Sequence, residues 1–312
     1  MITRFVHRVT VPLALAAVFI IPAAAQDTSS QTQTTFKSTV DVVTIQASVR
    51  DHKGKVLTGL TPTDFEVRDN GQLRPILSLR SDRQSPISIA LLVDMSGSMR
   101  LESKAGLARQ SYASILSQLR DGQDEVAVFT FDSALHERRG FTRDLSTLKG
   151  ALDTFDAFGT TSLYDATAEA ARRLAERSAA LKAIIVLTDG IDTSSSMTAT
   201  EVSGLASSID VPVFMVATVP SIDQRIMMET AERSTSSDAA DLRDLAEWTG
   251  GQFVFASSLL ESVVASSKLI DELRQQYILA IEAAAGREWR RLDVRVRRPA
   301  ATVKARSGYF AG

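Results

Sequence analysis

Cysteine is absent from the 312-residue chain, and histidine occurs only three times, at His7, His52 and His136. Without cysteine the protein has no disulfide, no thiolate metal ligand and no thiol nucleophile. Because imidazole is also scarce, any metal site must depend mainly on oxygen ligands. Oxygen ligands favour a hard divalent cation, and we expect Mg2+, with Mn2+ or Ca2+ as alternatives.

An excess of charge of either sign is lacking as well. The formal net charge is -2 and the isoelectric point is about 6.0. Proteins that bind nucleic acids usually carry a basic patch and a high isoelectric point, so we expect no nucleic-acid partner. Hydrophobic residues make up 44% of the chain, which is enough to build a full core.

Long apolar runs are missing except at the N-terminus. Arg4 and Arg8 precede an apolar run over 9–21, and small residues follow it as far as Ala25. A basic start, a short apolar run and small residues are typical of a secretory signal peptide. The run is shorter than the ~20 residues that a spanning helix needs, so a cleaved signal peptide at 1–25 is favoured over a membrane anchor.

The residues that follow predict where the mature chain resides. Residues 26–36 are polar and of low complexity, which indicates a flexible leader. No later stretch is long and apolar enough to span a membrane. We therefore expect a secreted or periplasmic protein without a transmembrane span in its mature chain. Whether the N-terminal segment stays as an anchor is left open by the sequence.

Both ends of the mature chain show strand patterns. Residues 37–82 contain β-rich stretches and a strong hairpin turn at Asn70-Gly71. Residues 277–312 alternate between apolar and polar positions, and 302–310 is predicted to be a single strand. Each segment has too few strands to bury two faces. We therefore predict that the two segments pair into one small β-domain.

The middle of the chain, residues 86–275, alternates short apolar strands with helical patterns. Helices are expected over 101–119, 144–155, 163–177, 199–209 and 239–248, with a last helix ending near 276. Alternation of this kind predicts an α/β domain with a doubly wound, mostly parallel sheet.

Polar side chains follow the strands of this domain in three places, at 94–98, 159–162 and 187–190. In an open α/β sheet the carboxyl ends of the strands form the ligand site. Hydroxyls from Ser96, Ser98 and either Thr160 or Thr161, with carboxylates from Asp94 and Asp189, suit a hard cation. A cation with so few charged ligands still attracts an anion, so an acidic side chain of a partner protein could complete its coordination.

These motifs resemble the metal ion-dependent adhesion site of von Willebrand factor type A domains. The resemblance rests on Asp-x-Ser-x-Ser after a buried strand, a loop threonine in Gly-Thr-Thr-Ser-Leu-Tyr-Asp-Ala, and Thr-Asp-Gly. Position by position it implies the metal ligands Asp94, Ser96, Ser98, Thr161 and Asp189. Thr160 stands where the family often has a second glycine.

The flanking segments resemble a narrower group, the bacterial exported "VWFA-related" proteins. The similarity lies in 60–67, in Asp69-Asn70-Gly71 and in 306–310 near the end. Together the resemblances imply an exported protein-binding module of the adhesion type, in which a divalent cation bridges to an acidic residue of a partner. The alternative is a structural envelope protein whose β-domain makes the contact and whose metal site is only stabilising.

Catalysis is not expected. Ser96 lacks the Gly-x-Ser-x-Gly turn of a serine nucleophile, and His136 is the only histidine of the α/β segment. Asp132 and Asp165 are interpreted as a turn residue and a helix first-turn acid. The long connection at 220–238 has no role that the sequence assigns.

Overall fold

The computed structural model describes residues 41–81, 83–154, 156–190, 192–221, 224–225 and 238–311. The expected signal peptide at 1–25 and leader at 26–36 lie outside the described residues, as does most of the connection at 220–238. No helix in the described part of the chain is long and apolar enough to cross a membrane.

A six-stranded sheet forms the centre of the α/β domain, in the order β10-β9-β8-β5-β6-β7. Its strands are β5 (Ile87–Asp94), β6 (Glu125–Phe131), β7 (Leu135–Thr142), β8 (Leu181–Thr188), β9 (Val213–Ala217) and β10 (Phe253–Phe255). All neighbours pair in parallel except β6 and β7, which are antiparallel. Every residue of β5 is buried, which explains its unbroken apolar run.

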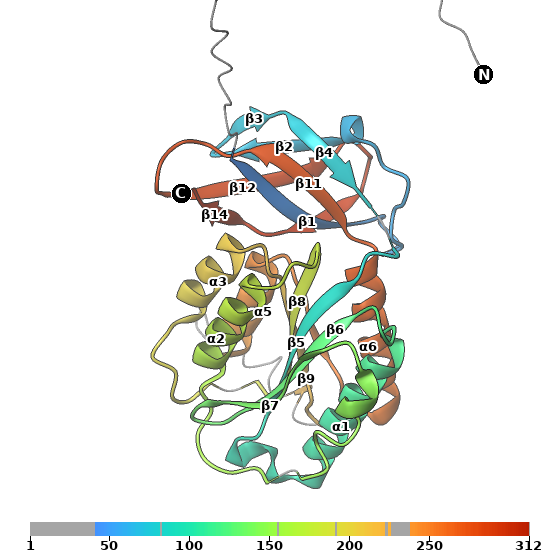
Figure 1. The fold of residues 1–312 in the computed structure, drawn as a ribbon, viewed down its shortest axis with the longest axis vertical. Helices are drawn as coiled ribbons and strands as arrows, with labels where there is room; N and C mark the ends of the chain where they lie inside the picture. Colours follow the sequence, from blue (N-terminus) through green and yellow to red (C-terminus); the bar gives the residue numbers. More distant parts are fainter. Residues whose placement is uncertain are drawn as a thin grey trace, which may run out of the picture. The chain divides into compact units, whose positions relative to one another are not determined.

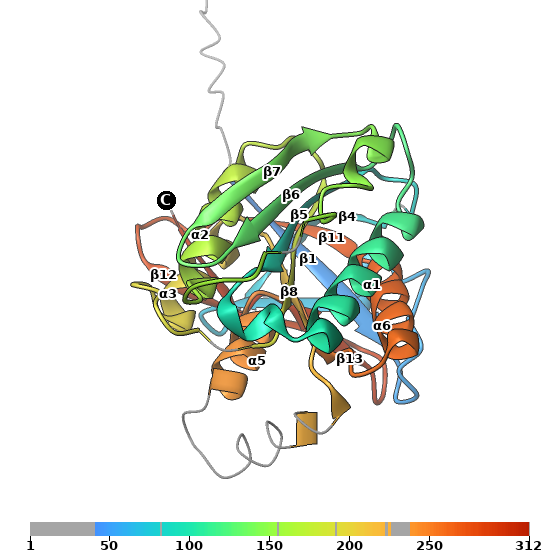
Figure 2. The same cartoon turned by 90° about the horizontal axis from the view of Figure 1, so that it is seen from below.

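Helices cover both faces of this sheet (Figure 2). One face packs against α1 (Glu102–Gln118) and α6 (Leu259–Arg274), which contribute buried residues such as Ile115 and Ile270. The other face packs against α2 (Leu163–Ala175), α3 (Ala199–Ser208) and α5 (Asp238–Trp248). This arrangement confirms the predicted doubly wound fold.

The helix expected at 144–155 is wrong. That segment holds only the 3-10 helix η3 (Leu145–Leu148), followed by turns. The Asp144 side chain accepts a hydrogen bond from the N–H of Ser146 and begins the short turn. Leu145 and Leu148 are buried, which accounts for the apolar spacing, while Gly150 disfavours a longer helix. Two further 3-10 helices are η1 (Pro62–Asp64) and η2 (Gly97–Arg100).

The chain ends pair into two four-stranded antiparallel sheets (Figure 1). One sheet has the order β13-β1-β11-β4 and the other β14-β12-β2-β3. The strands are β1 (Val42–Arg50), β2 (Phe65–Asp69), β3 (Gln72–Arg74), β4 (Ile76–Arg80), β11 (Tyr277–Glu282), β12 (Trp289–Val296), β13 (Thr302–Ala305) and β14 (Gly308–Phe310). A shared core includes Ile45, Phe65 and Leu279. The flanking β-domain predicted from both chain ends is therefore present.

The segment 302–310 is not the single strand that was expected. Its first part pairs with β1 in one sheet, and its last part pairs with β12 in the other. Between them Arg306 is 4% exposed and donates to the backbone carbonyls of Thr44 and Ser207. This buried arginine lies between the β-domain and α3, at the point where the chain passes from one sheet to the other. The alternation of the sequence continues across this break and does not reveal it.

Candidate metal centre

The ends of two adjacent central strands hold the two carboxylates of the predicted site. β5 and β8 pair in parallel, with Val93 opposite Leu187. The next residues, Asp94 and Thr188, therefore lie level with one another, and Thr188 Oγ1 donates to Asp94 Oδ2 over 2.6 Å. Asp189 comes directly after Thr188, so the topology brings both predicted carboxylates to one place.

The first hydroxyls are set by the tight turn after β5. Asp94 is fully buried, and its Oδ1 accepts a hydrogen bond of 2.8 Å from the N–H of Ser96. The hydroxyls of Ser96 and Ser98 lie 3.0 Å apart. Ser96 is buried and Ser98 is exposed, so this pair connects the buried carboxylate with the protein surface.

The loop before α2 lies against this turn. The N–H of Gly97 donates to the carbonyl of Gly159 over 3.0 Å, and a Cβ at Gly97 would stand 3.3 Å from that oxygen. Gly159 has a φ of +86°, a conformation that other residues adopt only with strain. Thr161 is buried and held by Thr193 through two hydrogen bonds of 2.9 Å, whereas Thr160 is exposed. The loop therefore presents its two threonines differently.

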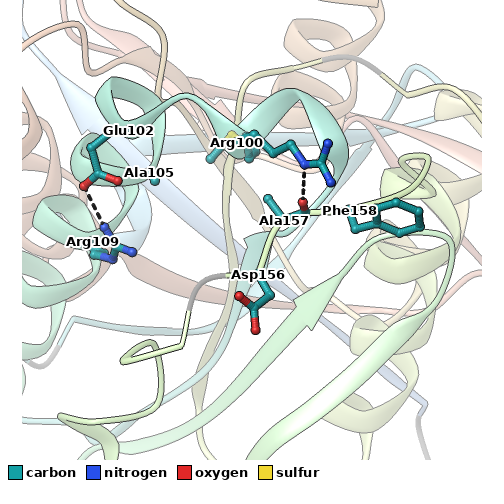
Figure 3. Close-up of a pocket in the computed structure, with 8 residues that line it drawn as sticks. Arg100, Glu102, Ala105, Arg109, Asp156, Ala157 and Phe158 are labelled. Atoms are coloured by element: carbon teal, nitrogen blue, oxygen red, sulfur yellow. Dashed lines mark hydrogen bonds and ion pairs between the residues drawn. The ribbon is translucent and has the colours of Figure 1, made fainter.

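A second contact fixes the same loop from its other side (Figure 3). Arg100 Nε donates to the carbonyl of Ala157 over 3.0 Å, and its guanidinium lies 5.5 Å from the centre of the Phe158 ring. The N–H of Phe158 donates to the carbonyl of Met95 over 2.8 Å. The turn after β5 and the loop before α2 thus form one connected unit. Together with Glu102 of α1, Arg100 and Asp156 line a pocket beside this unit.

Two further aspartates, Asp165 and Asp192, connect the loop after β8 to α2. Asp192 accepts from the N–H of Tyr164 at 3.1 Å, and Asp165 accepts from the N–H of Met197 at 2.9 Å. Burial raises the pKa of Asp165, but hydrogen bonds from the backbone of Ser196 and Met197 outweigh it and leave that pKa below its usual value. These carboxylates tie the loop after β8 to the start of α2.

The electrostatics of the two central carboxylates differ. Burial raises the pKa of Asp94 to about 6, and the charge of Asp189 adds to this rise, while hydrogen bonds from Thr188 and Ser96 oppose it. Asp189 is 1% exposed, and its Oδ2 receives the ammonium of Lys104 at 2.8 Å. Asp189 Oδ1 is buried and has no hydrogen-bond partner among the described residues.

The predicted donors fit a hard divalent cation. They supply hydroxyls, two buried carboxylates and one carboxylate oxygen that lacks a partner, and such an oxygen is costly to bury unless something binds it. Over the described ranges, no group of three or more His, Cys, Asp or Glu side chains is placed to hold a metal. A cation bound by the predicted set would therefore depend on serine and threonine hydroxyls as well as on Asp94 and Asp189.

Lys104 belongs to this centre, although the sequence alone did not predict it. It lies in the first turns of α1 and reaches a carboxylate 85 positions away along the chain. Its spacing within the helix carries no sign of this contact.

A family model for the von Willebrand factor type A domain matches residues 89–191. The chain carries a von Willebrand factor type A domain. The matched segment contains all five predicted ligands of the type A domain, from Asp94 to Asp189. A search of curated proteins found no match.

Several solved structures are similar to this chain. Proximal thread matrix protein 1 from the mussel byssus, with a zinc-occupied MIDAS motif, is 19% identical with a TM-score of 0.51. The alignment covers 65% of this chain and 50% of the mussel chain, so this chain spans about half the length of that protein. BatB from Bacteroides thetaiotaomicron is 17% identical, with a TM-score of 0.48 over 60% of this chain and 98% of its own. A type A protein from Catenulispora acidiphila is 14% identical, with a TM-score of 0.48 over 88% and 75%.

Proposed function

We propose that this protein is an exported protein-binding module of the adhesion type. Asp94, Ser96, Ser98, Thr161 and Asp189 would hold a divalent cation, with Mg2+ as the preferred ion. The cation would in turn bind an acidic side chain of a partner protein. The unpartnered, buried Oδ1 of Asp189, beside a second buried carboxylate, carries this proposal. The type A domain and the zinc-occupied motif of its mussel relative support it.

The residues around the proposed cation have different roles. Thr188 and the N–H of Ser96 orient the carboxylate of Asp94 and offset part of the cost of its burial. Ser98 is exposed and marks the side of the site that a partner can reach. When bound, the cation supplies a positive charge that its neutral hydroxyl ligands do not cancel, and this charge attracts an anionic group.

We also propose that the site binds rather than catalyses. The neighbouring carboxylates already accept hydrogen bonds, and they are poor general bases. Burial raises the pKa of Asp132, but the N–H of Ala134 and the ring of His136 outweigh it, so that this pKa lies below its usual value. His136 lies exposed on β7 and contacts Asp132 at 3.2 Å.

The signal-like N-terminus supports export to the periplasm or the exterior. This part of the proposal rests on the sequence of residues 1–25, which has a basic start, an apolar run and small residues before Gln26. Amino-terminal sequencing of the secreted or periplasmic protein would test it. A chain that retains Met1 in a membrane fraction would contradict cleavage after Ala25.

Capture of partners from an envelope extract tests the binding function. The mature chain is immobilised in Mg2+ or in EDTA, next to a variant that carries Ser96→Ala and Ser98→Ala. Ser133→Ala is the matched control, because it removes an exposed loop hydroxyl that follows the adjacent strand β6. We expect a protein that is captured by the wild type and by Ser133→Ala in Mg2+ only, and whose binding an acidic peptide reduces.

Equal capture in all lanes would contradict metal-dependent adhesion. In that outcome the β-domain would make the contact, and the metal site would only stabilise the fold. Replacing residues on the exposed face of β12, such as Arg291, would then locate the contact.

A further inference from the structure

The ammonium of Lys104 lies beside a buried carboxylate of the α/β domain. Its Nζ stands 2.8 Å from Asp189 Oδ2, and the two side chains are 13% and 1% exposed. Among the described residues, Asp189 is the only carboxylate that Lys104 contacts. In the described part of the chain, Lys104 therefore forms an ion pair with Asp189 alone.

This contact carries an electrostatic consequence. A buried carboxylate without a counter-charge destabilises a fold strongly, and a close ammonium relieves that cost. The same carboxylate is a predicted metal ligand. Two positive charges at one buried carboxylate repel each other, and the repulsion is strong because burial limits screening by water.

The backbone keeps the lysine close to the site. The N–H groups of Lys104 and Ala105 both donate to the carbonyl of Leu101, at 2.9 and 3.0 Å. Ala105 and Ala108 are buried against the domain, so α1 cannot turn the lysine away. The ammonium is thus tethered near Asp189 at a high local concentration.

We propose that Lys104 is a built-in competitor of the divalent cation at Asp189. It neutralises the carboxylate when no cation is bound and keeps the domain stable, and it must leave Oδ2 or be repelled when a cation binds. Lys104 thereby lowers the affinity of the site, so that the site fills only at higher metal concentrations. This inference rests on the metal-binding part of the proposed function.

Metal titration of the full mature chain tests the inference. The dissociation constants for Mg2+ and Mn2+ are measured by calorimetry for the wild type and for Lys104→Met. We expect Lys104→Met to bind at least about tenfold more tightly, which corresponds to about 1.4 kcal/mol. In EDTA the Tm of Lys104→Met should be lower than that of the wild type. At saturating metal concentration the two Tm values should become equal.

Three variants serve as controls. Lys104→Arg keeps the charge and should keep the weak affinity. Lys182→Met removes a lysine from β8, the strand that contains Thr188. Lys182 lies seven residues before Asp189, or roughly 23 Å away along the strand. At this distance the substitution should change the metal affinity less than about twofold. Asp189→Asn should abolish binding. If Lys104→Met does not fold, Lys104→Gln replaces it, because it keeps a donor for Oδ2 without the charge.

The outcomes separate this inference from the proposed function. Binding by the wild type with equal or weaker binding by Lys104→Met would overturn the competition and leave the metal-dependent function standing. Binding by Lys104→Met alone would uphold the competition and contradict a metal-dependent function of the natural chain. No binding by either protein would overturn both.

Discussion

Replacing Asp94 by asparagine should stabilise the protein when no metal is bound. Asp94 is fully buried, and burial raises the pKa of its carboxyl from 3.8 to about 6. A carboxyl whose pKa is raised this far contributes about 3 kcal/mol of lost stability once it is ionised. Asparagine has nearly the same shape and can still accept from the N–H of Ser96.

The expected gain is smaller than this upper value. The amide that Asp94→Asn introduces would force Thr188 Oγ1 to reorient, because that hydroxyl now donates to Asp94 and accepts from the N–H of Gly190. We expect a gain of about 1–2 kcal/mol in EDTA at pH 7.5, or a rise of about 2–8 °C in Tm for a domain of this size. Asp293→Asn, at a side chain of β12 that is 37% exposed, is the control and should change the Tm little.

The stability difference between the wild type and Asp94→Asn should also depend on pH. Because the pKa of Asp94 is raised in the folded state, the folded protein holds the proton more tightly than the unfolded chain. The contribution of the Asp94 carboxyl to the free energy of unfolding is therefore highest below about pH 4. This contribution is lost as the pH rises through about 6. The advantage of Asp94→Asn should vanish near pH 4.

Thermal unfolding in EDTA at pH 4 and pH 7.5 measures both effects. A variant that is no more stable than the wild type at pH 7.5, or whose advantage persists unchanged at pH 4, would refute the argument. In saturating Mg2+ the order should reverse if the proposed function holds, because the wild type gains stability from the cation and the variant loses a ligand.

Two further predictions concern the β-domain. Arg306→Met should lower the free energy of unfolding by about 3–5 kcal/mol, because it leaves Asp210 and the carbonyl of Thr44 without their buried cationic partner; urea denaturation measures this, and a loss below about 1 kcal/mol would contradict it. Tyr277→Phe should cost about 1–2 kcal/mol, because the hydroxyl bonds both the N–H of Leu60 and the carbonyl of Leu57, and unchanged urea unfolding would contradict it.

The parts of the fold that sequence could predict are those with local signals. The apolar run of β5, followed directly by Asp94, marks a buried strand and the edge where ligands bind, and Thr188 before Asp189 marks the next strand end. Parallel pairing then brings the two motifs together without further information. This topology accounts for the two carboxylates, whereas the choice of Thr161 over Thr160 comes from the resemblance to type A domains.

The parts that sequence could not predict depend on long-range contacts. The spacing of Leu145 and Leu148 fits a helix and a short turn equally, and only the capping by Asp144 and the glycine that follows decide between them. Arg290 continues the alternating pattern of β12, yet it is buried and its Nε lies 2.7 Å from Asp69. Lys104 likewise has no local signal for its contact with Asp189.

The pairing of the two chain ends also sets an order of events in folding. Strand β1 finds β11 and β13 only after nearly the whole chain exists, and the contact between Thr44 and Arg306 spans 262 positions. The α/β domain has mostly local strand neighbours and can close first, which shortens the loop that the β-domain must close. Until then β1 to β4 offer unpaired edges to other chains. Strands β13 and β14 thus complete both sheets of the β-domain, and we expect a chain truncated before β13 to aggregate more readily.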